Sequence, residues 1–266
     1  MGEKVEINMG IKKIAVMLAA LVTAVAAQAA PVPGQGTWET TLVGRDINRQ
    51  AVDGTDASAV YLYDITLGIT WLKNANMNGF QFWGTQMTWA ENLSMGSGSN
   101  VIDDWRLPSI TDTGFSGCDY SNAGGTDCGY NVDTSNSEMA YLFFVTLGNK
   151  SYCPPNDATC AGGPQAGFGL TNTGDFQNLQ SPFYWSGTVY APDPLSAWYF
   201  DPSIGGQVFG NKDFGGYAMA VRRYDVLADQ VPVQVVPEPE SMLLVLPALA
   251  GLGLIRRRQA FGTLAL

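Results

Sequence analysis

The chain has 266 residues, with 31 glycines, 14 Lys and Arg against 24 Asp and Glu, no histidine and a formal net charge of −10. The absence of histidine excludes Ser-His-Asp triads and zinc sites with histidine ligands, and the acidic balance argues against nucleic acid as a partner. Abundant glycine with few charged helix formers favours a loop-rich α+β fold over a helical bundle.

The first 29 residues are typical of a secretory signal peptide. Lys12 and Lys13 precede an apolar run over residues 14–26, and Ala27-Gln28-Ala29 has the pattern of a cleavage site. Cleavage there predicts an exported mature chain that begins at Ala30.

The next segments predict a leader followed by a folded domain. Residues 30–57 have no clear period, and we expect a leader or an edge strand. The domain proper is predicted over residues 58–224. Its first element is a hairpin, because residues 60–64 and 69–73 both alternate apolar and polar side chains around a short turn.

Two helices are expected in this domain. Thr85 is a candidate N-cap for a helix near residues 86–95. The run Ser135-Asn136-Ser137-Glu138 has the pattern of a capping box. It would open a helix near residues 136–148, which Gly148 ends.

The aromatic-rich end of the domain predicts three short strands. They cover residues 183–188, 197–200 and 217–223, with Gly, Pro, Asn and Asp in the breaks between them. Trp185 and Trp198 are expected to anchor the core.

Four cysteines in an exported chain indicate two disulfides. Three pairings exist, and the local choice joins Cys118 to Cys128 and Cys153 to Cys160, each within one Gly-rich loop. A metal site built from the four thiolates lacks any C-x2-C spacing, and a catalytic thiol lacks a histidine to activate it.

Acidic side chains in the turns leave two interpretations open. They can bind calcium, which takes six to eight oxygen ligands, or they can serve as ordinary turn and cap residues. The residues in question are Asp103, Asp104, Asp193, Asp201 and Asp213. The second interpretation is preferred, and neither a metal nor a cofactor is predicted.

The run Asp104-Trp105-Arg106-Leu107-Pro108 is interpreted as a structural plug. Arg106 is expected to pair with Asp104 or with an oxygen-rich loop.

Aromatic residues of the strand region are the candidate ligand contacts, since sugars present flat C–H faces to rings. The candidates are Tyr184, Tyr190, Trp198 and Tyr199. Because side chains alternate along a strand, one residue of each adjacent aromatic pair is expected to be buried and the other exposed.

Six segments follow one another in the order seen in the Lcl C-terminal-domain family, a domain of unknown function. They are GITWLKNAN, TWAENL, DWRLPS, SEMAYLFF, YWSGTVYAPDPLSAWYF and YAMAVRR. The chain resembles this family from about Ser58 to Arg223. The resemblance implies a C-type-lectin-like fold, with two helices packed on small twisted antiparallel sheets and long loops.

The chain departs from that family in one respect and from sugar-binding C-type lectins in another. About 25 residues, with two cysteines, are inserted between the Trp-Arg-Leu-Pro segment and the second helix. The triplets Glu-Pro-Asn or Gln-Pro-Asp, and Trp-Asn-Asp, with which such lectins bind sugar through calcium, are absent.

After a linker over residues 225–236, residues 237–260 resemble a PEP-CTERM sorting signal. Pro237-Glu238-Pro239 is followed by an apolar run over residues 241–255 and by Arg256-Arg257-Arg258. The run would span about 22 Å as a helix, short of the ~30 Å hydrocarbon core. The resemblance implies cutting by an exosortase-type protease; a plain membrane anchor is the alternative.

These features together predict an exported, surface-sorted protein that is not an enzyme. It would act as a binding or adhesion module in the extracellular polysaccharide matrix, with surface glycans as partners and membrane contact only through the C-terminal segment. The alternatives are a structural matrix component without a specific ligand and a relative of the formylglycine-generating enzymes. Those enzymes share the broad fold but need a copper-binding cysteine pair.

Overall fold

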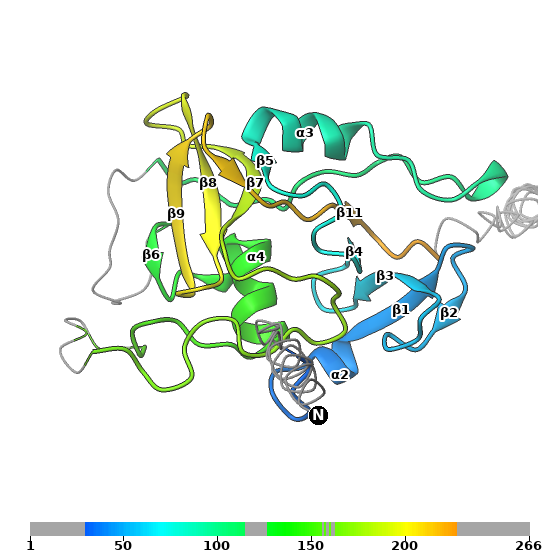
Figure 1. Cartoon of the computed structure of the whole chain (residues 1–266), viewed down its shortest axis with the longest axis horizontal. Helices are drawn as coiled ribbons and strands as arrows, with labels where there is room; N and C mark the ends of the chain where they lie inside the picture. The colour runs from blue at the N-terminus through cyan, green and yellow to red at the C-terminus, as the bar shows by residue number, and fades with distance from the viewer. Residues whose placement is uncertain (1–29, 115–126, 156, 158–159, 161–162, 228–266) are drawn as a thin grey trace, which may run out of the picture. The chain divides into compact units, whose positions relative to one another are not determined.

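The computed structural model describes residues 30–114, 127–155, 157, 160 and 163–227 (Figure 1). The chain divides into two units, Met1–Val226 and Leu227–Leu266, and every helix and strand described lies in the first. The described part is mixed α and β, with few helices and mostly antiparallel sheets, which confirms the α+β class. Within it, no helix has the length and apolar character needed to cross a membrane.

The elements follow one another along the chain with these bounds. The helical elements are α2 (Trp38–Thr41), α3 (Trp83–Glu91), η2 (Gly98–Asn100), η3 (Thr134–Asn136), α4 (Glu138–Tyr141) and η4 (Leu142–Thr146). The strands of the first half are β1 (Leu42–Asp46), β2 (Ala51–Val52), β3 (Ala59–Asp64), β4 (Ile69–Leu72) and β5 (Gln81–Phe82). Those of the second half are β6 (Gly129–Tyr130), β7 (Tyr184–Val189), β8 (Ser196–Asp201), β9 (Gly206–Asn211), β10 (Gly215–Gly216) and β11 (Val221–Arg223).

The larger sheet has five strands in the order β11-β4-β3-β1-β2. The predicted hairpin is present, since β3 and β4 pair antiparallel with Tyr63 opposite Thr70. Residues 30–57 are more than a leader, because β1 and β2 belong to this sheet and the folded part begins before Ser58. Gly44 interrupts the apolar–polar alternation of β1 in the sequence. The strand needs glycine there, because a Cβ would lie 2.7 Å from the Asp53 carbonyl oxygen.

The second sheet has four strands in the order β6-β9-β8-β7. Strands β7 and β8 match the predicted ones, whereas β9, which contains Gly206 and Gly210, was not predicted. The third predicted strand, residues 217–223, is largely wrong. Only its end forms β11, which pairs with β4 in the other sheet through Val221 opposite Trp71.

The first helix begins earlier than predicted. It covers Trp83–Glu91 with Phe82 at the N-cap position and no side-chain cap, so Thr85 lies inside the helix. Asn92 ends it.

The second helix also begins differently, because Ser137 rather than Ser135 is its N-cap. The Ser137 hydroxyl accepts a hydrogen bond from the Ala140 amide at 3.1 Å. Ser135 instead belongs to the short turn η3, where its amide and hydroxyl donate to Asp133. The helix continues as the wider turn η4, and Gly148 follows with φ of 65°.

The main core lies where both sheets meet the α4 helix, which stands between them in Figure 1. It joins Leu62 and Trp71 of the larger sheet, Phe143 of the helix, and Tyr184 and Phe200 of the smaller sheet. As predicted, Trp185 and Trp198 are fully buried, each in a smaller cluster beside it.

Candidate functional site

Three of the four aromatic residues predicted to contact a ligand are buried, and the prediction is wrong for them. Tyr184 and Trp198 are 0% exposed and Tyr190 is 5% exposed. The Tyr184 hydroxyl accepts from the Gln180 amide at 2.7 Å, and the Trp198 ring nitrogen donates to Asp112 at 2.8 Å. Burial pushes the pKa of Tyr184 far above its usual range.

The alternation argument failed for Tyr184 and Trp185, because the start of β7 is covered on both faces, but it held for Trp198, which is buried, and Tyr199, which is partly exposed. The first three residues of each strand are buried, whichever way they point. The pairing of β7 with β8 also shifts between Trp185 and Val189, which changes the face presented by the rest of the strand.

Tyr199, the fourth predicted residue, belongs to a different group of rings that reaches solvent. Its ring centroid lies 4.5 Å from that of Phe183, and Phe183 lies 6.2 Å from Phe80. Phe80, Phe82 and Phe214 are 51%, 58% and 63% exposed. We call these five residues the aromatic surface.

Close backbone packing supports the aromatic surface. Strands β5 and β10 pair with Phe82 opposite Gly215. A Cβ at Gly215 would lie 2.2 Å from the Phe80 ring, so only glycine lets that ring rest on the strand. Below them, the buried Trp185 ring lies 5.6 Å from Phe183 and 5.7 Å from Tyr199.

A cation borders the aromatic surface on the α3 side. The Lys212 ammonium lies 4.4 Å from the centre of the Trp83 ring and donates to the Pro194 carbonyl at 2.7 Å. The Trp83 ring nitrogen donates to the Ser186 carbonyl at 2.8 Å, which fixes the ring. An amphipathic ligand would therefore meet rings first and a held ammonium group at the border.

Sequence reasoning missed Phe80, Phe82 and Phe214 because they lie in short turn segments outside the long predicted strands. A signal was present: Phe80-Gln81-Phe82 alternates like a strand, and Gly215-Gly216 follows Phe214. What the sequence lacks is the long-range pairing that brings the two segments together.

The plug around Trp105 is buried as expected, but its ion pairs differ from the prediction. Trp105 stacks on Tyr61 with ring centroids 5.7 Å apart. Arg106 does not pair with Asp104; its two terminal nitrogens each lie 2.7 Å from a Glu138 oxygen. Asp104 instead accepts from Arg222 at 2.6 Å.

Two of the five candidate aspartates, Asp193 and Asp201, act as turn residues. Asp193 accepts from the Leu195 amide at 3.1 Å and the Ser196 hydroxyl at 2.8 Å, and Asp201 accepts from the Ser203 amide at 2.9 Å. Nowhere in the described residues do three or more Cys, Asp or Glu side chains come together to hold a metal ion.

Shifted carboxyl groups gather in a cavity of about 470 Å³ beside β1 and β2, away from the aromatic surface. Burial raises the pKa of Asp175, although Lys73 opposes the shift. The pKa of Asp53 is lowered by hydrogen bonds from the Thr55 hydroxyl and amide. The Asp53 carboxyl is held by the Thr55 hydrogen bonds, whereas Oδ1 of Asp175 is buried without a hydrogen-bond partner among the described residues.

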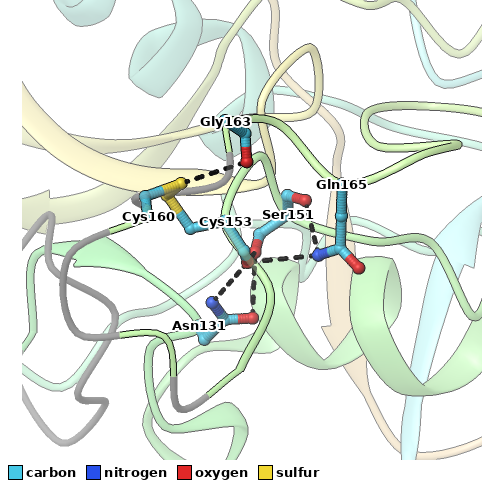
Figure 2. The surroundings of a disulfide bond; sticks show 6 residues. All are labelled: Asn131, Ser151, Cys153, Cys160, Gly163 and Gln165. Carbon is cyan, nitrogen blue, oxygen red and sulfur yellow. Dashed lines mark hydrogen bonds between the residues drawn. A yellow bond between two sulfur atoms is a disulfide. The ribbon is translucent and has the colours of Figure 1, made fainter.

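One of the two predicted disulfides is present. Cys153 and Cys160 are bridged, with their Cα atoms 5.4 Å apart (Figure 2). Cys128 is fully buried, but Cys118 lies outside the described residues, so the Cys118–Cys128 pairing stays a prediction. The sorting motif, Pro237-Glu238-Pro239 with Arg256–Arg258, also lies outside them.

No family model, curated protein or solved structure matches the chain.

Proposed function

We propose that the protein is an exported binding module that contacts polysaccharide through the aromatic surface. The observation that carries this proposal is the exposure of Phe80, Phe82 and Phe214, each more than half exposed, in a chain that buries its tryptophans Trp71, Trp185 and Trp198 completely. Grouped exposed apolar side chains mark interaction sites. Flat rings suit the C–H faces of sugar rings, and the hydroxyl of Tyr199 adds a polar group.

The terminal sequence features support a location for this binding module outside the cell. The signal peptide pattern and the resemblance to a PEP-CTERM signal support export, a membrane-tethered stage, and release to the cell surface or matrix by an exosortase-type protease. The resemblance to the Lcl C-terminal-domain family supports a C-type-lectin-like form of the α+β fold. An acidic surface disfavours direct adsorption to anionic membranes and nucleic acids.

The test is a glycan array probed with the exported protein and with a Phe82→Ala/Phe214→Ala variant. Two exposed rings contribute a stacking contact each, so at roughly 1–3 kcal/mol per stacked ring we expect the variant to lose about 30-fold or more in affinity. Tyr224→Ala is the matched control, because Tyr224 is 65% exposed but lies outside the aromatic surface. Equal binding by all three proteins would remove the aromatic surface from the function.

Two alternatives give different results in the same experiments. A structural matrix component without a specific ligand would bind no glycan on the array. An enzyme related to the formylglycine-generating enzymes needs a reduced, copper-binding cysteine pair, which thiol titration of the exported protein would detect.

A further inference from the structure

The two cysteine-containing loops pack against each other. Asn131, at the end of the first loop, donates from its side-chain nitrogen to the Cys153 carbonyl at 3.0 Å. The Ser151 hydroxyl donates to the Asn131 side-chain oxygen at 2.9 Å (Figure 2). No disulfide is needed for this contact, since the Cys153 partner is Cys160 in the same loop.

Gln165 closes the second loop over the same carbonyl. Its side-chain nitrogen donates to the Ser151 carbonyl at 2.8 Å and to the Cys153 carbonyl at 3.1 Å (Figure 2). The Cys153 carbonyl thus joins Asn131 and Gln165, while the Cys153–Cys160 disulfide holds the loop that carries it. The amide groups are fixed before any ligand arrives.

These side chains line a cavity of about 430 Å³, within the range of small-molecule sites. We call it the loop cavity. Its polar lining comes from Asn131, Thr134, Asn149, Lys150, Ser151 and Gln165. Its apolar lining comes from Val132, Phe144 and Pro155. The lining contains amides, hydroxyls and one ammonium group but no carboxylate.

Some of these groups are available to a ligand. Asn149 is committed, because its side-chain oxygen accepts from Thr171 and Asn172. Among the described residues, no partner bonds to the Thr134 hydroxyl, the Gln165 side-chain oxygen or the Lys150 ammonium. The cavity therefore offers a hydroxyl, an acceptor and a cation beside an aromatic ring.

We propose that the loop cavity binds a terminal residue of a neutral saccharide. Sugar hydroxyls both donate and accept, which matches the Thr134 hydroxyl and the Gln165 oxygen, and the Phe144 ring supplies an apolar wall. The Lys150 ammonium is exposed to solvent, where a single ion pair contributes little, so it does not require an anionic ligand. This inference rests on the proposed function as a saccharide-binding module.

The loop cavity is a separate site from the aromatic surface. Strand β8 begins at Ser196, which pairs with Asn211 near Lys212, and ends at Asp201, which pairs with Gly206. The loop cavity lies at the second end, where the Tyr152 amide donates to Ile204. A strand of this length spans about 17–20 Å. One protein molecule would thus hold a polysaccharide at two points.

The test is an NMR titration of the exported protein with cellohexaose, maltohexaose and mannohexaose. Side-chain amide resonances of Asn131 and Gln165 report on the loop cavity, and backbone amides of Phe82 and Phe214 report on the aromatic surface. We expect both sets to shift with at least one of these probes. Thr134→Val should weaken binding at the loop cavity about three- to tenfold through loss of one hydrogen bond. Thr66→Val, in an exposed turn, is the matched control.

The possible results separate the two proposals. Shifts at Phe82 and Phe214 alone would overturn the loop cavity and leave the proposed function intact. Shifts at Asn131 and Gln165 alone would support the loop cavity and remove the aromatic surface. Absence of any shift with all three probes would overturn both. Tighter binding of an oligogalacturonate at Asn131 and Gln165 would overturn the neutral class of ligand.

Discussion

At the scale of single residues, Trp185 connects the core to the surface. It is fully buried and supports both Phe183 and Tyr199 of the aromatic surface. Trp185→Ala should lower the free energy of unfolding by about 3–5 kcal/mol, the usual loss for a large buried aromatic side chain. Urea denaturation measures it, and an unchanged midpoint would contradict this role.

Trp185→Phe is the informative companion, because the Trp185 ring nitrogen is buried without a hydrogen-bond partner in the described part of the chain. Removing an unpaired donor costs little by itself, so the loss comes from reduced packing volume alone. We expect Trp185→Phe to cost less than half of the Trp185→Ala effect. A larger loss would mean that the ring nitrogen contributes a bond of its own.

Tyr61 gives stability a dependence on alkaline pH. Burial raises the pKa of Tyr61 to about 12, and its hydroxyl has no hydrogen-bond partner among the described residues. An unfolded tyrosine loses its proton near pH 10. Since the folded state keeps the proton longer, stability is complete below pH 10 and falls as the pH rises from about 10 to 12.

Above pH 10, the Tyr61→Phe variant should therefore be more stable to unfolding than the unchanged protein. At pH 7 the substitution should change the free energy of unfolding little. The expected difference in slope is about 1.4 kcal/mol per pH unit, the value for one proton. Thermal unfolding of both proteins across pH 9–12 measures this difference. Tyr224→Phe, at an exposed position, should follow the unchanged protein; parallel curves for Tyr61→Phe would contradict the assignment.

At the scale of elements, the start of the second helix distinguishes two serines. The Ser137 hydroxyl accepts the Ala140 amide, whereas the Ser135 hydroxyl donates to Asp133 in the preceding turn. Loss of a helix cap costs about 1 kcal/mol. Ser137→Ala should therefore destabilise the protein by that amount and Ser135→Ala by less, as chemical denaturation would show. A larger loss of stability for Ser135→Ala than for Ser137→Ala would instead support the capping box predicted from the sequence, with Ser135 as the N-cap.

The elements that could be predicted are those whose apolar–polar pattern is complete within one short stretch of sequence. The β3–β4 hairpin alternates along both strands around a short turn, and it formed as predicted. Strands β1 and β9 were hidden by glycines, whose backbones pack closely without contributing to a hydrophobic pattern.

The candidate site could be predicted only in part, for a different physical reason. Periodicity tells which side chains share a face of a strand, but it does not tell whether other elements cover both faces. Tyr184 and Trp185 are both buried because both faces of their strand are covered, whereas Trp198 is buried and Tyr199 partly exposed, as alternation predicts. The segments that carry Phe80 and Phe214 are brought together by the pairing of Phe82 with Gly215, more than 100 residues away, which no local pattern encodes.

At the scale of the whole molecule, both predicted cuts fall outside the described residues. Ala30 forms a bridge with Asn172, and Leu227 is the last residue described. The stretch 30–236 contains 8 Lys and Arg against 20 Asp and Glu, a formal net charge of −12. A mature chain of this charge would be soluble and repelled by anionic surfaces.

The C-terminal segment has the opposite character, and this leads to a prediction about processing. Its apolar run is too short for a comfortable span, so it suits temporary retention better than permanent anchoring. Arginines stay on the cytoplasmic side, which would leave Pro237-Glu238-Pro239 at the outer face within reach of a membrane protease. In a host with the matching exosortase, the mature protein should lack Arg256–Arg258 and end near residues 236–239.

Intact-mass measurement of the surface or matrix fraction checks this prediction. Recovery of the chain in the membrane with its full C-terminus would favour a plain anchor instead. Pro237→Ala/Pro239→Ala should trap the uncut protein, because the protease would no longer find its motif. If cutting continues unchanged in that variant, the enzyme reads another feature, and the apolar run or the arginine cluster becomes the determinant to test by replacing Arg256–Arg258 with glutamine.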